Sequence, residues 1–381
     1  MPRVAIRPSR DLAELLRRRR KELKITLREA EERSRAFGSV IPFSTLGKVE
    51  QGRVDPGVIR FQQLLDIYDI PKEVALDVVA LETLRGEKPE ATDPEALYAE
   101  AVRLWNARQI GKALGAMYAL RQAVTGRPEL DGLRQKAQLH LAVVVANLGR
   151  FNLSKCLIET LLRERLPDPI RLRCFVQLAS AWMRLGNHEL AAAMLARAEM
   201  LVSGAGPQEA GWVAQEHGLI DLAMGNHEAA ARFFDRARDL FAAAGDVRGM
   251  FKVGLSRVRV HLARGEADAA LALAQELLAG ALPGFQAPVR ILVGQAQLAA
   301  GAVQEAIATL GRAIEEADAG DAPTRYLGHH YMALAHAAAG DAAAAAAERN
   351  AARQARGALD FTPDPLVFAS GAPRQDRQAR A

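Results

Sequence analysis

The sequence predicts an all-α protein in which a small five-helix domain precedes a long array of helical hairpins. Three observations predict this class. From residue 95 onward, apolar residues follow helical spacing and no strand pattern occurs. Glycine returns every 36 to 40 residues through that second part. Basic residues concentrate at the start, where residues 1–60 hold 15 Lys and Arg against 8 Asp and Glu, whereas the remaining 321 hold 35 against 37.

Composition limits the number of domains and the cellular compartment that can be expected. The chain has 381 residues, half of them hydrophobic, which is enough for two or more domains with substantial cores. Two cysteines, Cys156 and Cys174, do not make a disulfide framework, so a reducing cytoplasm is expected. The N-terminus lacks the apolar segment of a signal peptide, and the longest apolar run, near residues 141–146, is too short for a membrane span. Neither secretion nor membrane insertion is expected.

Two helices open the chain. Asp11 is a suitable cap for a helix to about Lys24, with leucines facing inward and the arginine run at residues 17–20 facing outward. Thr26 followed by Glu29 is a capping-box start for a second, short helix. A turn containing Gly38 follows.

The third helix, residues 44–50, is the centre of the N-terminal domain. Leu46 and Val49 are three residues apart and predict a buried face. The outward positions that remain are Phe43, Ser44, Gly47 and Lys48.

Two further helices complete the predicted domain. Asp55 and Pro56 are a helix start, because Asp caps helices and Pro is tolerated in a first turn. Pro71 opens a fifth helix, and Tyr68 with its apolar neighbours closes the small core. The polar, proline-bearing segment at residues 85–94 is expected to be a linker.

The run STLGKVEQGRVDPG, residues 44–57, resembles the second half of an XRE-type, phage-repressor-like helix-turn-helix. The resemblance implies that residues 1–88 form a five-helix, lambda-repressor-like domain that binds double-stranded DNA. It places Phe43, Ser44 and Lys48 at base-contacting positions and Thr45 and Arg53 at phosphate-contacting ones. Arg28 completes the predicted DNA-binding set. The localised positive charge is what a phosphate-backbone binder needs.

The second part repeats a two-helix unit. The recurring glycines mark the bend between the two helices of each unit: Gly149, Gly186, Gly225, Gly265, Gly301 and Gly340. Small residues recur five positions after the bend, as at Ala191 and Ala230, and again twelve positions after it, as at Ala198 and Ala237. Small side chains at both positions let two helices cross closely. With an earlier unit bending at Arg108, the sequence predicts seven units.

This pattern, as in LGNHELAAAMLARA and MGNHEAAARFFDRA, resembles tetratricopeptide repeats over residues 95–359. The resemblance implies a right-handed α-superhelix with a concave wall. Spacing alone leaves other helical-hairpin solenoids open. Residues 360–381 are rich in proline without a helical period and are expected to be a disordered tail.

Positions 13, 9, 6 and 2 residues before each bend glycine share one face of the first helix of a unit, the face that lines the concavity in tetratricopeptide proteins. On this face the sequence has polar and cationic residues suited to an extended peptide, with Arg or Lys for carboxylates and amides for the peptide backbone. The predicted groove residues are Lys136, Asn147, Arg173, Gln177, Arg184, Lys252 and Arg259. Solvent-exposed polar residues of any amphipathic helix are the alternative reading.

Catalytic and metal-binding motifs are not found. The sequence has no GxxxxGK(S/T) loop, no CxxC pair and no HExxH. His329, His330 and His336 are close together but lack nearby cysteines. We therefore expect neither an enzyme nor a cofactor or metal site.

An XRE-type helix-turn-helix joined to tetratricopeptide repeats resembles the RRNPP group of peptide-sensing bacterial regulators. The resemblance implies a homodimeric transcription regulator whose repeats bind a signal peptide or a protein. A second hypothesis from another class stays open, a protein–protein adaptor whose basic N-terminal module docks onto a protein rather than DNA.

Overall fold

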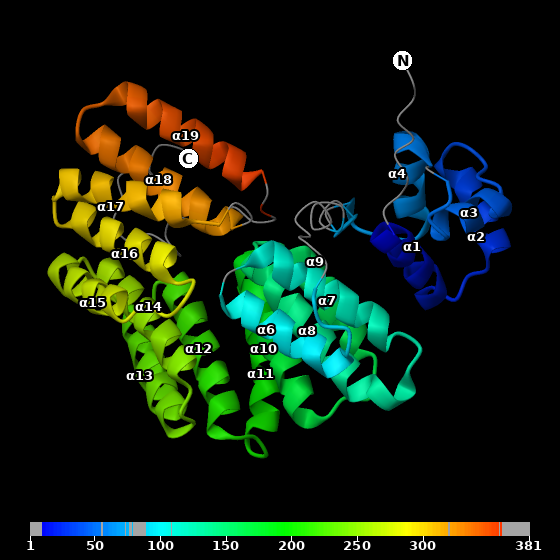
Figure 1. The fold of residues 1–381 in the computed structure, drawn as a ribbon, viewed down its shortest axis with the longest axis horizontal. Coiled ribbons are helices and arrows are strands. Elements are labelled where there is room, and N and C mark those ends of the chain that lie inside the picture. The colour runs from blue at the N-terminus through cyan, green and yellow to red at the C-terminus, as the bar shows by residue number, and fades with distance from the viewer. Residues whose placement is uncertain are drawn as a thin grey trace. The chain divides into compact units, whose positions relative to one another are not determined.

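A computed structural model describes residues 10–54, 56–72, 74–75, 78, 89–107, 109–318, 321–357 and 359. In this part of the chain the regular structure is entirely helical, as Figure 1 shows, so the prediction of an all-α fold is confirmed. The chain divides into two compact units, residues 1–85 and residues 86–381.

The N-terminal unit contains four described α-helices and one short 3-10 helix. They are α1 (Arg10–Glu22), α2 (Leu27–Ser34), η1 (Arg35–Phe37), α3 (Phe43–Glu50) and α4 (Gly57–Ile67). The predicted capping box is present, because Thr26 accepts a hydrogen bond from the Glu29 N–H and Glu29 accepts one from the Thr26 N–H. The predicted fifth helix lies largely outside the described residues.

The arginine run does not face outward as a block. Arg20 forms a bidentate ion pair with Glu50, whose side chain is 4% exposed, at 2.8 Å from Nε to Oε1 and 2.9 Å from Nη2 to Oε2. The Tyr68 hydroxyl donates to the same carboxylate at 2.7 Å. Arg19 donates to the Tyr68 carbonyl at 3.2 Å. The outward prediction is therefore wrong for Arg20, because a buried carboxylate on α3 needs a cation.

The second unit is a series of seven helical hairpins in the described residues, and successive hairpins stack side by side (Figure 1). The hairpins are α6 (Pro94–Asn106) with α7 (Ile110–Val124), α8 (Asp131–Asn147) with α9 (Phe151–Leu162), α10 (Asp168–Arg184) with α11 (His188–Val202), α12 (Pro207–Met224) with α13 (His227–Ala243), α14 (Val247–Ala263) with α15 (Ala267–Ala279), α16 (Gln286–Ala299) with α17 (Val303–Glu316), and α18 (Ala322–Ala338) with α19 (Ala342–Arg356). A 3-10 turn, η2 (Pro128–Leu130), precedes α8. The predicted seven units are thus observed.

Each recurring glycine sits at the bend that the sequence assigned to it. All six adopt positive φ values, from 75° at Gly265 to 83° at Gly225. This left-handed conformation is strained for residues other than glycine. Arg108, the predicted first bend, lies outside the described residues. The small residues at the fifth position after the bend are buried, with Ala191 and Ala230 fully so. Close helix crossing within each hairpin follows from these two features.

A second set of glycines lies within helices and lets aromatic rings sit on the helix backbone. A Cβ placed on Gly218 of α12 would lie 2.6 Å from the Phe234 ring, and one on Gly249 of α14 would lie 2.5 Å from Phe241. Phe234 and Phe241 are both fully buried. These glycines hold α13 close to α12 and α14, a role that the bend pattern did not predict.

The structure describes the two cysteines but not the predicted C-terminal tail. Residues 360–381, the predicted tail, lie outside the described residues. Both cysteines are free thiols, and burial raises the pKa of Cys174 to about 12. Among the described residues, no helix combines the length and apolar character needed to cross a bilayer.

Candidate functional site

The first candidate site is the exposed face of α3. Leu46 and Val49 are buried as predicted, with at most 1% of their surface exposed. Phe43 is 46% exposed, and Ser44 and Lys48 are exposed beside it. The helix begins after Pro42, and the Phe43 N–H donates to a Glu31 carboxylate oxygen of α2 at 2.8 Å. That contact fixes the start of α3 against α2.

Two other predicted residues border this face. The Arg28 guanidinium of α2 lies over the Phe43 ring, 5.7 Å from its centroid. Arg53 is exposed directly after α3, and its N–H donates to the Lys48 carbonyl at 2.9 Å. Thr45 is half-buried. The structure thus brings Arg28, Phe43 and the exposed end of α3 together.

Gly47 does not belong to that outward face. It is half-buried, and a Cβ placed on it would meet Leu27 Cδ1 at 3.4 Å. The prediction that Gly47 points outward is therefore wrong, because α2 packs against this side of α3. The absence of a side chain lets the two helices approach.

The turn between α2 and α3 is held by a residue that the sequence did not single out. Gln63 of α4 donates to the Phe37 carbonyl at 2.5 Å and accepts from the Ser39 hydroxyl at 3.1 Å. Phe37 and Val40 remain 43% and 50% exposed on this turn. Two exposed apolar side chains therefore precede Phe43 by six and three positions in the sequence.

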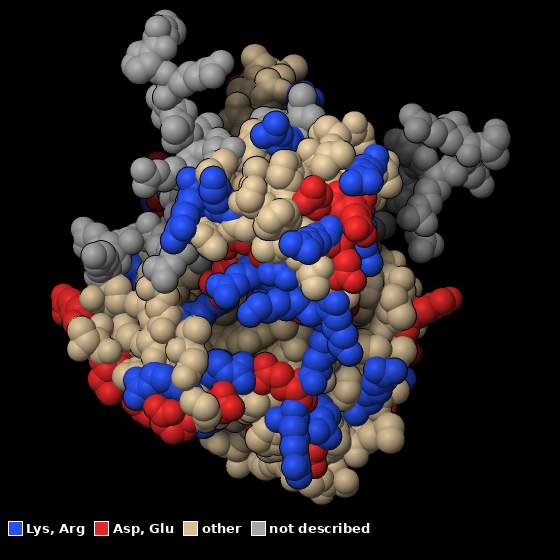
Figure 2. Space-filling model, turned by 90° about the vertical axis from the view of Figure 1, so that its right-hand side faces the viewer, with Lys and Arg blue, Asp and Glu red and all other residues tan. Residues whose placement is uncertain are grey.

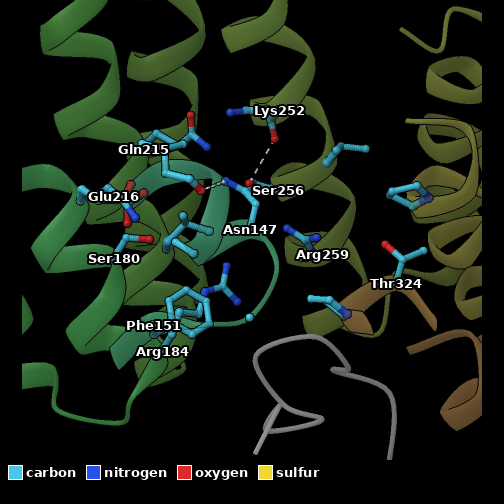
Figure 3. A pocket seen from close by; sticks show the side chains of 18 of the residues that line it. Asn147, Phe151, Ser180, Arg184, Gln215, Glu216, Lys252, Ser256, Arg259 and Thr324 are labelled. Carbon is cyan, nitrogen blue, oxygen red and sulfur yellow. Dashed lines mark hydrogen bonds between the residues drawn. The ribbon is translucent and has the colours of Figure 1, made fainter. Parts of the chain in front are cut away.

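The second candidate site is a groove in the repeat unit, a cavity of about 340 Å³ (Figure 3). First helices of successive hairpins line it, from α8 through α18. Six of the seven predicted groove residues are in its lining: Asn147, Arg173, Gln177, Arg184, Lys252 and Arg259. Lys136 is exposed but is not part of the lining. The four-position register thus places six of these residues along one cavity, and their contact with a ligand stays a prediction.

The groove carries a positive field. Its charged lining residues are four cations, Arg173, Arg184, Lys252 and Arg259, and two acids, Glu216 and Asp321. Asp321 accepts hydrogen bonds from the Thr324 N–H and hydroxyl. The field also acts on His140 of α8, whose pKa is lowered to about 4, first by burial and then by the nearby positive charges.

Burial shifts the pKa values of three charged groups that line the groove. Burial raises the pKa of Glu216 to about 7, although the positive charges of Arg184 and Lys252 oppose that rise. Burial lowers the pKa of Lys252 to about 8 and that of Arg259 to about 10, and the charge of Arg184 adds to the effect on Arg259. The Lys252 ammonium also lies 4.9 Å from the centroid of the Trp212 ring.

Two glutamines of the groove were missed by the sequence reasoning. Gln215 and Gln295 are 8% and 5% exposed, and the Oε1 atom of each is buried without a hydrogen-bond partner among the described residues. Gln295 lies six residues before Gly301, so extending the same register to α16 would have found it. Gln215 lies ten residues before Gly225 and is outside that register.

The surface charge can be followed in Figure 2. On the face shown, Lys and Arg side chains gather near the middle, with Asp and Glu side chains among them.

The fold and the groove define a helical-hairpin repeat protein, preceded in the chain by a separate helical unit. No family model matches the chain, and no curated protein is significantly similar to it in sequence. Solved structures with similar folds include a tetratricopeptide repeat protein from Parabacteroides merdae, 13% identical, covering 72% of this chain and 96% of that chain with a TM-score of 0.44. Another is Bacillus thuringiensis PlcR in complex with the peptide PapR7 and DNA, 12% identical, covering 71% and 95% with a TM-score of 0.42.

Proposed function

We propose that this protein is a sequence-specific, double-stranded-DNA-binding transcription regulator of the cytoplasm, and that its repeat groove senses a peptide or protein ligand. The observation that carries the proposal is the division of α3 into two faces. Leu46 and Val49 fix one face in the core, whereas Phe43, Ser44 and Lys48 are presented to solvent. A short helix anchored in this way can enter a major groove with its side chains against base edges.

The surroundings of α3 supply the remaining requirements of DNA binding. Arg28 of α2 and Arg53, which follows α3 in the chain, are both exposed and suited to phosphate contacts, which hold a protein in register on the duplex. The N-terminal sequence carries the chain's excess of positive charge.

A homodimer is part of the proposal. One recognition helix reads only a few base pairs, and two related by a two-fold axis read a palindrome with much greater discrimination. The repeat unit is the element proposed to pair the two copies.

A protein–protein adaptor is the second candidate, and one observation favours it. Phe37 and Val40 are exposed on the turn before α3. Exposed apolar residues that precede an exposed aromatic residue, Phe43, by a few positions in the sequence are suited to a protein partner. In this alternative the basic unit docks onto that partner instead of DNA.

A binding titration separates the two candidates. A preferred duplex would be selected from a random pool with the full chain, and affinity for the selected and a scrambled duplex would be measured by gel shift over a series of salt concentrations. A DNA-binding regulator loses affinity steeply with salt but keeps its preference for the selected duplex. A protein–protein adaptor is expected to select no preferred duplex from the random pool.

Two matched substitutions test the roles of individual residues. Lys48→Ala is expected to weaken binding to the selected duplex by roughly 5- to 150-fold while changing scrambled-duplex binding little. Arg53→Ala is expected to weaken both equally and to reduce the salt slope by about 1. Equal losses on both duplexes for Lys48→Ala would contradict its role as a base reader.

A further inference from the structure

Two arginines from different helices line the same groove. Arg184 lies near the end of α10 and Arg259 lies in α14, and both line the same cavity (Figure 3). They are close enough for the positive charge of Arg184 to act on Arg259, in addition to the effect of burial. Two guanidinium groups in one partly buried space favour a planar anion, because each offers parallel N–H donors to a carboxylate.

The same groove also contains acceptors that require donors. Gln215 Oε1, Gln295 Oε1 and Glu216 Oε2 are buried, and none has a hydrogen-bond partner among the described residues. A buried acceptor without a donor carries a free-energy cost that a ligand N–H group can remove. A fully deprotonated inorganic anion such as sulfate supplies no such donor.

The lining between these polar groups is apolar. Phe151, Trp212, Leu219 and Ile291 form part of it. The cavity volume of about 340 Å³ is at the lower end of the range for ligand pockets, roughly 300 to 1,000 Å³. It therefore suits the end of a chain with small or apolar side chains rather than a folded domain.

We propose that the groove binds the C-terminal end of a short peptide, with the free terminal carboxylate held by Arg184 and Arg259 and the peptide N–H groups donating to Gln215 and Gln295. This inference rests on the proposed sensor function and narrows its ligand to a peptide with a free C-terminus. An internal segment of a protein partner has no terminal carboxylate to occupy the arginine pair.

The test uses the full chain and two peptide pools. One pool holds random hexapeptides with free C-terminal carboxylates, and the other holds the same sequences as C-terminal amides. Peptides retained by the immobilised protein are quantified by mass spectrometry. We expect the free-acid pool to be retained on the order of tenfold or more above the amide pool, because a charge-assisted contact is lost in the amides.

Matched variants locate the effect. Arg259→Gln is expected to abolish the preference for free acids, whereas Arg257→Gln is expected to keep it, because Arg257 is on the same helix but pairs with Asp235 outside the groove. Arg184→Gln repeats the test from α10. Circular dichroism melting measures whether each variant is folded. If Arg259→Gln does not fold, the result for Arg184→Gln tests the proposal.

Three results would overturn the proposal. They are equal retention of acids and amides by the unaltered chain, retention of neither pool, and an unchanged preference in a folded Arg259→Gln or Arg184→Gln protein. None of these results alters the gel-shift measurement, so failure of this inference and failure of DNA binding are distinguishable.

Discussion

At the scale of single residues, the Arg20–Glu50–Tyr68 cluster shows that an arginine expected at the surface pairs with a buried carboxylate. Glu50 as a whole residue is 6% exposed, and its carboxylate accepts hydrogen bonds from the Arg20 guanidinium and the Tyr68 hydroxyl. The hydrogen bond to Glu50 raises the pKa of Arg20, and burial raises that of Tyr68. Arg20 is therefore a structural cation that ties α1 to the end of α3, and it is not available to a phosphate.

Glu216 gives the groove a specific pH dependence. Its pKa in the folded protein is about 7 against an ordinary value of 4.5, so between these values the folded state holds a proton that the unfolded chain has released. Stability from this group is thus present below about pH 4.5 and is lost as the pH rises through 7. The groups facing Glu216 are Arg184, Lys252 and Ser180.

We expect Glu216→Gln to flatten the decline of the melting temperature between pH 5 and pH 8 relative to the unaltered chain. Melting curves by circular dichroism at a series of pH values measure this. Glu228→Gln, an exposed carboxylate at the start of α13, is the control and should leave the slope unchanged. Parallel slopes for all three proteins would show that Glu216 is ionised throughout.

At the scale of the element, close helix packing depends on where a side chain is missing. Phe234 of α13 occupies the space above Gly218 of α12, and the ring is fully buried with little room to move. The α12–α13 hairpin is part of the large central apolar core. A methyl group at Gly218 would therefore displace either the ring or the helix.

Gly218→Ala is expected to destabilise the protein by about 1–3 kcal/mol, despite the better helix propensity of alanine. Chemical denaturation followed by the fluorescence of Trp182 and Trp212, which pack against this core, measures the change. Gly132→Ala in α8 is the matched control, because a Cβ there meets nothing within 4 Å. It should be neutral or should stabilise by up to about 1 kcal/mol.

At the scale of the whole repeat unit, one contact joins hairpins that are distant in sequence. Arg248 of α14 donates to the Asn106 side chain at the end of α6 and also reaches the Asn106 carbonyl at 3.4 Å. Its guanidinium lies 5.1 Å from the centroid of the Phe285 ring. A simple stack of repeats has only nearest-neighbour contacts, so this one adds a constraint on the first hairpin.

Arg248→Ala is expected to raise amide hydrogen exchange in α6 and α7 by a factor of roughly five, which corresponds to the loss of about 1 kcal/mol of local stability. Exchange measured by mass spectrometry should stay unchanged in α18 and α19. Arg238→Ala, whose exposed side chain pairs with Asp235 and Asp239, is the control and should alter neither region. Uniform acceleration in every hairpin would indicate global destabilisation instead of a local constraint.

Much of the fold could be predicted from the sequence because its signals are local. The bend glycines, the small residues that follow them and the Thr26–Glu29 capping box are each specified by residues a few positions apart. The inner face of the groove followed from the same register. Gln215 could not be found in this way, since it lies outside the four-position register of that face.

The sequence by itself determined the helical class, the number of hairpins and the helix face on which six groove-lining residues lie, because helical period and turn chemistry depend on residues a few positions apart. Only the tertiary structure decided that Arg20 neutralises Glu50, that Gly47 packs on Leu27 and that Arg184 and Arg259 line one cavity. Each of those pairs joins different helices, and the partner of a side chain across such a gap depends on how whole elements pack, which no local pattern encodes.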